Sequence, residues 1–302
     1  MTTLGELAEE VVGDLRQYST SPERTGTFVG WARNDANAIV GIQLADVATD
    51  LSDTHIELST GEIVHVSHYA LDGSTTTCPP WFRAQLGTAA SDTIPPNSRV
   101  IVNPIWARYQ VARKLVEGIN AISEDLFAVA EAEYVTTPQQ SNYELPANCD
   151  SVLNVTLEDL GPTQMHRAIQ SWTVDVTNTD GKRYLRLYPL GLSGVTMRVT
   201  YRAAVVVPDP ANLAATWAST GLPSTASDLP GLFAKSQLIL SPEAARTQQA
   251  SVEQGERSRA LQGWSATAAS RRFQELFAQR LSVERRKLLD RWPVRPHKEL
   301  AS

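Results

Sequence analysis

The chain places one strongly helix-forming segment between two strand-forming regions, and this order constrains its fold most. Residues 104–122 keep apolar side chains at helical spacing, and Pro104 suits the first turn of a helix. The regions on both sides are short runs rich in Val, Ile, Thr and aromatic residues, separated by turn-forming Gly, Asn, Asp and Pro. The sequence therefore predicts an α+β protein with two separate β regions.

The first β region is predicted at residues 27–104, after an amphipathic helix over residues 2–18. Thr3 can cap that helix, and Glu6 completes a capping box. The expected buried stripe of the helix consists of Leu4, Leu7, Ala8, Val11, Val12 and Leu15. Strands are predicted at 27–33, 38–46, 54–59, 62–71 and 98–104. The stretch IELSTGEIVHV predicts a hairpin with Gly61 in its turn.

The second β region is predicted at residues 134–207. Alternation of apolar and polar residues marks strands at 151–159, 168–178, 183–190 and 195–207. The NTDG sequence at 178–181 predicts a hairpin turn. In the last strand, one face carries Val195, Met197, Val199 and Tyr201, and the other carries Thr196, Arg198, Thr200 and Arg202. This pattern is typical of a half-buried antiparallel strand and favours a small sandwich or jelly roll.

The C-terminal part is predicted to be helical after a loop at 208–227 that can hold a helical turn. An apolar helix is expected at 227–240, and Ser241 and Pro242 signal the start of a polar helix that continues to Leu261. The last helix is predicted at 268–290, and Pro293 and Pro296 end it. Its expected apolar stripe consists of Phe273, Leu276, Phe277, Leu281, Leu288 and Leu289.

These elements predict a helical bundle with a small β region and an inserted antiparallel β-sandwich-like domain. The bundle combines the N-terminal, central and C-terminal helices. The expected organisation is an N-terminal helix at 1–26, a small β-rich region at 27–104, a central helix at 105–133, an antiparallel β domain at 134–207, and a C-terminal helical region at 208–302.

Charge is distributed unevenly along the 302 residues. The formal net charge is −6, which does not favour nucleic-acid binding by the whole molecule. Residues 243–302 carry 12 Lys and Arg against 7 Asp and Glu, whereas the rest carries 15 against 26. A basic end on an acidic body suggests a contact surface at that end. Two cysteines, no signal-peptide pattern and no long apolar run predict a soluble protein made in a reducing cytoplasm, with no membrane partner.

The sequence offers no convincing catalytic or metal-binding set. His65 and His68 are three apart on an expected strand and would point to opposite faces, so a metal site is not expected. Ser193 lacks the second glycine of a nucleophile elbow, and Cys78 and Cys149 have no neighbouring His. Phosphate-loop and dinucleotide-binding patterns are also absent from the sequence. We therefore expect a structural protein, not an enzyme, with no cofactor.

The segment 54–119 resembles a region of the neck and connector proteins of tailed bacteriophages. In that family a hairpin carrying a Glu and an apolar strand lead to an RGxxGTxAxxH stretch, and a further strand and a helix follow. Here the stretch reads WFRAQLGTAASD, with Ala84 in place of the first Gly and Asp92 in place of the His. The matching positions are Arg83, Gln85, Gly87, Thr88 and Ala89. Segments 185–203 and 232–295 are also similar to the β region and helical end of such adaptors.

The resemblance implies a structural virion protein located in the phage neck. Such adaptors form a ring, expected to be a dodecamer, that joins the portal to a stopper or tail protein. DNA passes through the lumen without sequence-specific binding, and an acidic channel wall would not hold its phosphates. Ring formation requires head-to-tail contacts that close. The C-terminal end is expected to dock on the portal through Phe273, Phe277, Arg285, Arg286, Lys287, Arg291, Trp292 and Arg295.

The WFRAQLGTAASD stretch is interpreted as a turn and packing device. Gly87 is expected to let the chain bend, Thr88 and Ala89 to allow close approach, and Arg83 or Gln85 to bond nearby backbone.

Three other functions stay open at this point. The protein could occupy another virion position, as a tail-completion, tail-tube or baseplate protein. It could be a carbohydrate-binding module with Trp172, Tyr184 and Tyr188 as an aromatic platform, although strand positions favour core packing. It could also be a packaging factor that binds DNA through its basic end.

Overall fold

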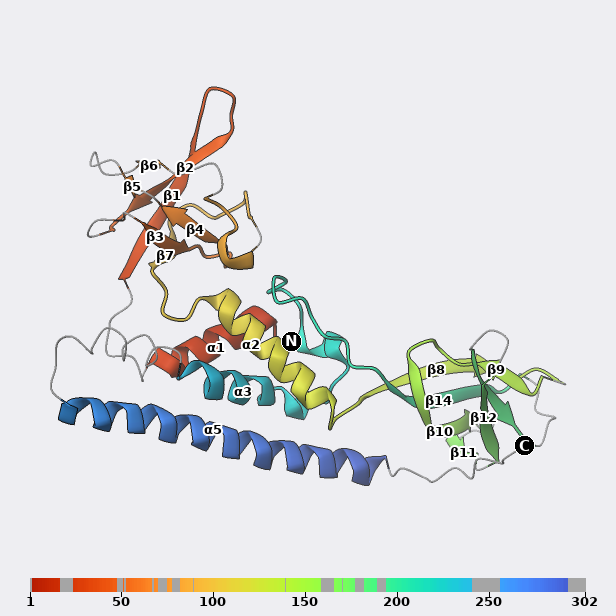
Figure 1. Cartoon of the computed structure of the whole chain (residues 1–302). Coiled ribbons are helices and arrows are strands. Elements are labelled where there is room, and N and C mark those ends of the chain that lie inside the picture. The colour runs from red at the N-terminus through yellow and green to blue at the C-terminus, as the bar shows by residue number, and fades with distance from the viewer. Residues whose placement is uncertain are drawn as a thin grey trace. The chain divides into compact units, whose positions relative to one another are not determined.

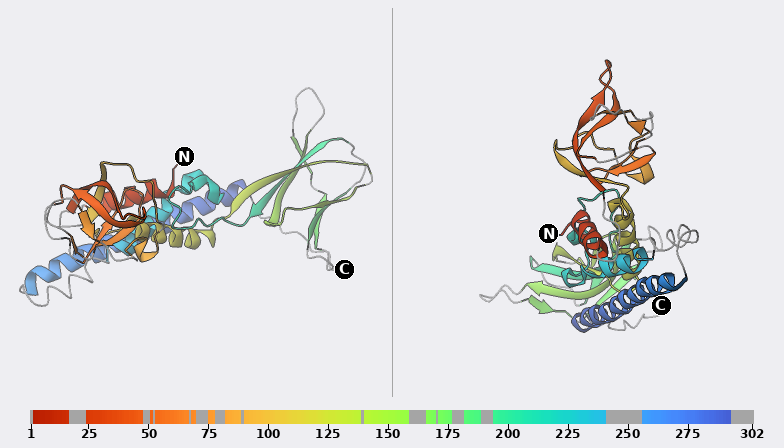
Figure 2. Two further views of the ribbon diagram at one scale, coloured as in Figure 1. Left: turned by 90° about the horizontal axis from the view of Figure 1, so that it is seen from above. Right: turned by 90° about the vertical axis from the view of Figure 1, so that its left-hand side faces the viewer.

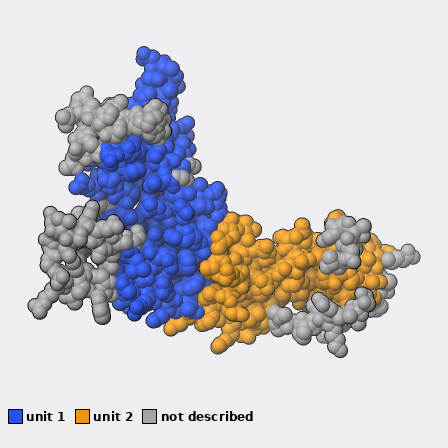
Figure 3. Space-filling view, viewed as in Figure 1, with its two compact units in different colours: residues 1–119, 208–216, 228–278 blue, residues 120–207, 217–227, 279–302 orange. Residues whose placement is uncertain are grey.

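The structure is a computed structural model, and it describes most of the chain in two compact units (Figure 3). The described residues are 2–16, 24–47, 51, 53–66, 68–69, 75–77, 82–88, 90–138, 140–158, 166–169, 171–176, 182–188, 194–240 and 256–292. The first unit comprises residues 1–119, 208–216 and 228–278, and the second comprises 120–207, 217–227 and 279–302. Helices and antiparallel sheets occur together, which confirms the α+β class.

The N-terminal helix α1, Leu4–Arg16, begins with the predicted capping box. The Thr3 N–H donates to the Glu6 carboxylate at 2.8 Å, and the Glu6 N–H donates to Thr3 Oγ1 at 3.1 Å. All six apolar residues of the predicted stripe are buried. They pack with α2, Arg108–Ser123, and α3, Leu229–Leu238, in the helical core of the first unit.

The long C-terminal helix α5, Glu256–Arg291, contributes Ala266 and Phe273 to the same core (Figure 1). It is longer than the predicted last helix and begins twelve residues earlier. Among its residues from 266 onward, whose side chains the structure describes, the buried ones are Ala266, Ser270, Glu284 and Leu288. Leu276 and Leu289 are each 38% exposed, so the predicted stripe was wrong at these two positions. The buried face includes a serine and a glutamate, which an apolar pattern does not mark.

The central helix begins later than predicted and ends at Ser123, one residue beyond the predicted 122. It begins at Arg108 instead of 104, after Asn103 with a left-handed φ of 49°. The Arg108 N–H donates to the buried Glu57 carboxylate at 2.8 Å. A residue distant in sequence thus accepts a hydrogen bond from an N–H of the first turn that has no acceptor within the helix. Residues 128–133 are not helical, because the alternating AVAEAEYV sequence forms the strand β8, Ala128–Val135.

The first β region is a seven-stranded antiparallel sheet with the order β4-β3-β7-β1-β2-β6-β5. Its strands are β1 Arg24–Arg33, β2 Ile39–Ala45, β3 Thr54–Glu57, β4 Ile63–Val66, β5 His68–Tyr69, β6 Thr75–Thr77 and β7 Ser98–Val102. The strands β1 and β2 form a long antiparallel ribbon (Figures 1 and 2). The predicted β3–β4 hairpin is confirmed, and Gly61 in its turn has a φ of 85°. The predicted strand at 62–71 is two strands that pair with different partners.

The second unit contains two antiparallel sheets that share one hydrophobic core. The order is β11-β10-β14-β8 in one and β12-β13-β9 in the other. Besides β8, the strands are β9 Asn142–Glu144, β10 Cys149–Glu158, β11 His166–Ala168, β12 Trp172–Val176, β13 Arg183–Leu187 and β14 Thr196–Ala203. In β14, Met197, Val199 and Tyr201 are buried as predicted, and Thr200 is buried too.

Two 3-10 turns, Trp217–Thr220 and Ser224–Ala226, confirm the helical turn expected within 208–227. The predicted NTDG turn and the polar helix segment at 241–255 lie outside the described residues. Among the helices that the structure describes, none combines the length and apolar character needed to cross a bilayer.

Candidate functional site

A buried ion pair organises the loop that carries the WFRAQLGTAASD stretch. Glu62 follows the hairpin glycine, and its side chain is fully buried. Both carboxylate oxygens bind Arg83, with Nε to Oε1 and Nη2 to Oε2 each at 2.9 Å. This paired geometry is the strong, directional form of an arginine–carboxylate contact. The Glu62 hydrogen bond also raises the pKa of Arg83 above its usual value.

The same carboxylate receives two backbone N–H groups of the loop. Ser91 donates at 2.7 Å and Ala84 at 3.3 Å, so Glu62 binds both ends of the segment 84–91. Arg83 returns a hydrogen bond to the Ser91 carbonyl at 2.9 Å and contacts the exposed Asp92 carboxylate. The guanidinium of Arg83 also lies 4.4 Å from the ring centre of Trp31. Arg83 and Glu62 therefore use their charged groups to fix the backbone of this stretch.

Gln85 and Thr88 complete the internal contacts of this loop. The Gln85 side-chain amide donates to the Arg83 carbonyl at 3.0 Å, and the Thr88 hydroxyl donates to the Gln85 carbonyl at 2.9 Å. Thr88 Oγ1 also accepts the Ile63 N–H at 3.0 Å, which joins the loop to β4. Gly87 ends a short 3-10 turn, Gln85–Gly87, and Ala89 lies outside the described residues.

Two residues of the loop have left-handed backbone conformations. Ala84 has a φ of 51° and Leu86 has a φ of 56°. The left-handed region costs an ordinary residue about 1–2 kcal/mol. Leu86 is also 53% exposed, although it is a large apolar residue. The sequence pointed to Gly87 as the bending residue, whereas the strain recorded in the structure lies on its neighbours.

The residues predicted to dock on a portal have different environments. Phe273 packs against the helical core, and the Phe277 ring lies 5.7 Å from that of Phe233. Arg285 binds Asp125 at 2.8 Å, and Lys287 binds the buried Glu284 at 2.8 Å.

Arg286 is exposed, whereas Arg291 lies over its neighbour Trp292, and Arg295 is outside the described residues. Arg271 and Arg272 are exposed on the same helix. The exposed arginines of α5 thus include a pair outside the predicted docking set, which the sequence suggested as an exposed helix face or a protein contact.

Two histidines of the first β region, His55 and His65, form a cross-strand pair, whereas the side chain of His68 lies outside the described part of the structure. His55 of β3 lies opposite His65 of β4, with ring centres 5.0 Å apart, and His65 Nε2 is 2.8 Å from Asp53. Burial and the neighbouring His65 lower the pKa of His55 below its usual value. Within the described part of the chain, no group of three or more His, Cys, Asp or Glu side chains could hold a metal ion.

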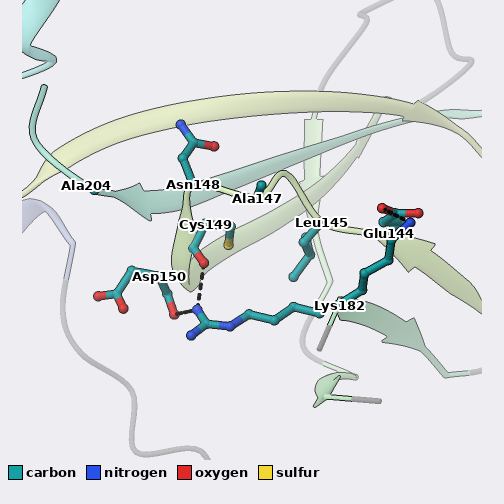
Figure 4. A pocket seen from close by; sticks show the side chains of 9 residues that line it. Glu144, Leu145, Ala147, Asn148, Cys149, Asp150, Lys182 and Ala204 are labelled. Atoms are coloured by element: carbon teal, nitrogen blue, oxygen red, sulfur yellow. Dashed lines mark hydrogen bonds and ion pairs between the residues drawn. The ribbon is translucent and has the colours of Figure 1, made fainter. Parts of the chain in front are cut away.

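A pocket of about 500 Å³ lies beside β9 and the start of β10 in the second unit (Figure 4). Its charged residues bind one another, nearby backbone, or, in the case of Asp150, Arg202 outside the pocket. Lys182 binds Glu144 at 2.7 Å, and Arg183 donates to the Cys149 carbonyl at 2.6 Å. The Cys149 thiol is buried, and burial raises its pKa, so the neutral thiol predominates at neutral pH. Such a thiol is a poor nucleophile.

A smaller pocket of about 280 Å³ occurs in the first unit, with Arg16, Arg99 and Arg108 among its lining residues. Arg108 is engaged with the Ser59 carbonyl and with Glu9. Glu9 and Glu57 line the pocket as well, so its charges of opposite sign nearly balance.

The three aromatic residues considered as a sugar platform have different environments. Trp172 is buried in the core between the sheets of the second unit. Tyr188 is 46% exposed, and the Arg186 guanidinium lies 5.2 Å from its ring centre. A platform needs coplanar exposed rings, and the buried Trp172 does not provide one.

Glu62 and Leu86 are among the residues of this site that sequence reasoning did not select. The signal for Glu62 was a charged residue directly between a hairpin glycine and an apolar strand, GEIV. The signal for Leu86 was an apolar residue next to Gly87 in an otherwise polar turn.

No family model matches the sequence, and no curated protein matches it. Two solved structures contain similar chains. One, the neck of an empty GTA particle, gives 15% identity and a TM-score of 0.23 over 42% of this chain and 64% of that one. The other, the virion of a native gene transfer agent (GTA) particle, gives 15% identity and a TM-score of 0.22 over 50% of this chain and 71% of that one. The present chain thus covers less than two thirds of the first, and both TM-scores are too low to define the fold.

Proposed function

We propose that the protein is a structural subunit of a tailed-phage-like virion. In this proposal its copies form a ring in the neck, joining the portal to a stopper or tail protein and continuing the DNA channel. One observation carries the proposal. The charged and polar groups of the motif that resembles neck proteins bind one another and their own backbone. Such a motif shapes a surface for assembly and leaves no polar group poised for chemistry.

The C-terminal helical region is proposed as the portal-docking region. In this proposal Phe273 and Phe277 hold α5 in place, because Phe273 packs on the helical core of the first unit and Phe277 packs on Phe233 of α3. The contact itself is proposed to use the exposed arginines Arg271, Arg272 and Arg286 against an acidic portal surface. Arg285 and Lys287 would join this contact only if they exchanged their present partners, Asp125 and Glu284, for groups of the portal.

The finer architecture is part of the same proposal. We regard the two sheets of the second unit as an inserted sandwich-like domain, at 134–207 in the predicted organisation. The helices around it would form the bundle that contacts neighbouring copies. The ring is proposed to be a dodecamer. The acidic body suits the wall of a channel through which DNA passes, because negative charge does not bind the DNA phosphates.

The test is the mass of the purified chain in solution, measured alone and after mixing with the portal protein of the same particle. A subunit of the neck is expected to form a ring, either alone or on the portal, with a copy number that matches the portal symmetry. Electron microscopy of the mixture would then show the ring at one end of the portal.

A chain that stays monomeric and ignores the portal would contradict the proposal. Binding to a glycan in that case would favour a carbohydrate-binding module. Binding to DNA that weakens steeply with salt would favour a packaging factor. A ring that instead joins tail-tube or baseplate proteins would move the chain to another position in the particle.

A further inference from the structure

We propose that the segment 82–88 is a built-in cover for one edge of the seven-stranded sheet. In this proposal the segment, called the edge cover below, keeps the edge strand β4 from pairing with β4 of a second copy of this chain. The inference does not depend on the proposed place in a neck. It gives Thr88, a residue of the WFRAQLGTAASD stretch, a role beyond the shape of a turn.

The strand β4 stands at one end of the sheet and has β3 as its neighbour. Across the hairpin, the Leu58 N–H donates to the Glu62 carbonyl at 2.9 Å, so the backbone groups of Glu62 face β3. These groups alternate between the two sides along a strand, and the N–H groups of Ile63 and His65 therefore point away from β3. An open edge of this kind is a template on which a further strand can form.

The edge cover accepts both of these outward N–H groups. The His65 N–H donates to the Phe82 carbonyl at 2.8 Å, and the Ile63 N–H donates to Thr88 Oγ1 at 3.0 Å. The Thr88 hydroxyl donates its own hydrogen to the Gln85 carbonyl, which leaves its lone pairs for Ile63. Phe82 and Thr88 are only 2% and 8% exposed, so the cover is anchored at both of its ends. The two acceptors take the place that carbonyls of a further strand would occupy.

The edge cover does not itself extend the sheet. Ala84 and Leu86, with φ values of 51° and 56°, lie in the left-handed region, whereas a strand requires an extended backbone with negative φ. The Ala84 N–H is also occupied, because it donates to the Glu62 carboxylate at 3.3 Å. The cover thus presents no regular edge of its own. This gives the strained backbone a purpose, since it ends the sheet at β4.

The strand that the cover excludes is β4 of a second copy. The sequence of β4 is IVHV, which favours a strand and contains none of the Lys, Glu or Pro residues that protect many edge strands. In an antiparallel pair of β4 strands, Ile63 of one copy would lie opposite His65 of the other, and both residues would exchange their N–H and C=O bonds. Such a pair has two-fold symmetry. Protection of this edge therefore depends on the cover.

The first test compares Thr88→Val with Thr88→Ser in the full chain. Valine has nearly the shape of threonine but cannot accept the Ile63 N–H, whereas serine keeps the hydroxyl. The Ile63 amide is expected to exchange its hydrogen about tenfold or more faster in Thr88→Val, because a buried N–H without an acceptor favours opening of the cover. Exchange in Thr88→Ser should stay close to that of the wild type.

The second readout is the mass in solution, measured by analytical ultracentrifugation over a concentration series without other virion proteins. Thr88→Val is expected to form paired assemblies with twice the mass of the wild-type species. Thr88→Ser is the matched control and should keep the wild-type mass. If Thr88 only supported the fold of its own chain, exchange would become faster without this change in mass.

A double variant, Thr88→Val with His65→Pro, identifies the surface that pairs. Proline removes an N–H that points away from β3, so the hairpin keeps its own bonds while the edge loses a donor. The double variant is therefore expected to return to the wild-type mass.

Three results would overturn the inference. The first is unchanged exchange of the Ile63 amide in Thr88→Val. The second is faster exchange with the wild-type mass at every concentration, and the third is pairing that persists when His65→Pro is added. Each of these leaves the neck proposal standing, because that proposal is tested by the mass of the wild-type chain with and without portal.

Discussion

The two β regions of this protein are built on different principles. The seven-stranded sheet of the first unit is tied to its long loop by the buried pair of Glu62 and Arg83. The two sheets of the second unit enclose an apolar core, and their ion pairs, such as Arg198 with Glu133, lie on the exposed face. Charge fixes a loop in one region, whereas apolar packing joins two sheets in the other.

The difference shows what each kind of contact can specify. Apolar burial is strong but has no preferred direction, so it brings sheets together without fixing a loop conformation. A paired arginine and carboxylate have fixed geometry, and here they hold a strained backbone at Ala84 and Leu86. The contacts of the charged pair in the first unit therefore fix the shape of a surface loop. The apolar contacts in the second unit hold two sheets together.

The largest effect is expected from Glu62→Ala. Removing one partner leaves Arg83 without its carboxylate in a mostly buried site, and such a loss costs about 3–5 kcal/mol of unfolding free energy. Urea denaturation of the variant and the wild type would measure the difference. The matched control is Glu144→Ala, which removes a half-exposed partner of Lys182 and should cost far less. Equal losses in the two variants would contradict the special role of the buried pair.

Met197→Ala should produce the next largest effect, this time in the second unit. Met197 is fully buried on β14, between β10 and β8, and truncation leaves a cavity that costs about 2–5 kcal/mol. Met197→Leu keeps the volume and should cost less than about 1.5 kcal/mol. Thermal unfolding followed by circular dichroism would compare them. If both substitutions were equally harmless, apolar packing would not be what joins these sheets.

Arg198→Gln should change stability little, although Arg198 contacts both Glu133 and Glu131. These carboxylates lie on the exposed face of the sheet, where solvent screens the attraction. The hydrogen bond from Arg198 raises the pKa of this already cationic group, with no consequence near neutral pH. A Tm that falls as far as in Glu62→Ala would show that surface pairs also hold the second unit.

The smallest effect is expected from acidification near His55. Its pKa is lowered in the folded state by burial and by His65, so the unfolded chain binds the proton more readily. Stability should therefore fall as pH decreases below about 6.5, the usual histidine value, and the loss should be complete once the pH passes below the lowered pKa. His55→Asn should reduce this dependence in denaturation curves measured from pH 7 to 5. An unchanged pH dependence in the variant would remove His55 as its cause.

The sequence predicted elements whose signals are local. The capping box of Thr3 and Glu6, the hairpin at Gly61 and the alternation around Met197 each occur within a few residues. Physical propensities act over the same range, so these features could be read directly. The α+β class followed from them.

The start of α2 and the loop site could not be predicted in the same way. Arg108 begins its helix because Glu57, 51 residues earlier, receives its N–H. Glu62 and Ser91 are joined across 29 residues, and the local sequence around either residue does not identify its partner. Contacts of this kind depend on tertiary placement, which a single sequence does not reveal. The strand β8 was missed for another reason, because its alanines and glutamates also suit a helix.

The contact between Glu62 and Arg83 also has a kinetic meaning. A carboxylate and a guanidinium can be withdrawn from water only after β3, β4 and the loop have reached their final geometry, so the pair should form late in folding. Loss of a late contact leaves the folding rate almost unchanged and mainly accelerates unfolding. The pair would thus slow the opening of the folded state and set how long the loop between Glu62 and Ser91 keeps its shape.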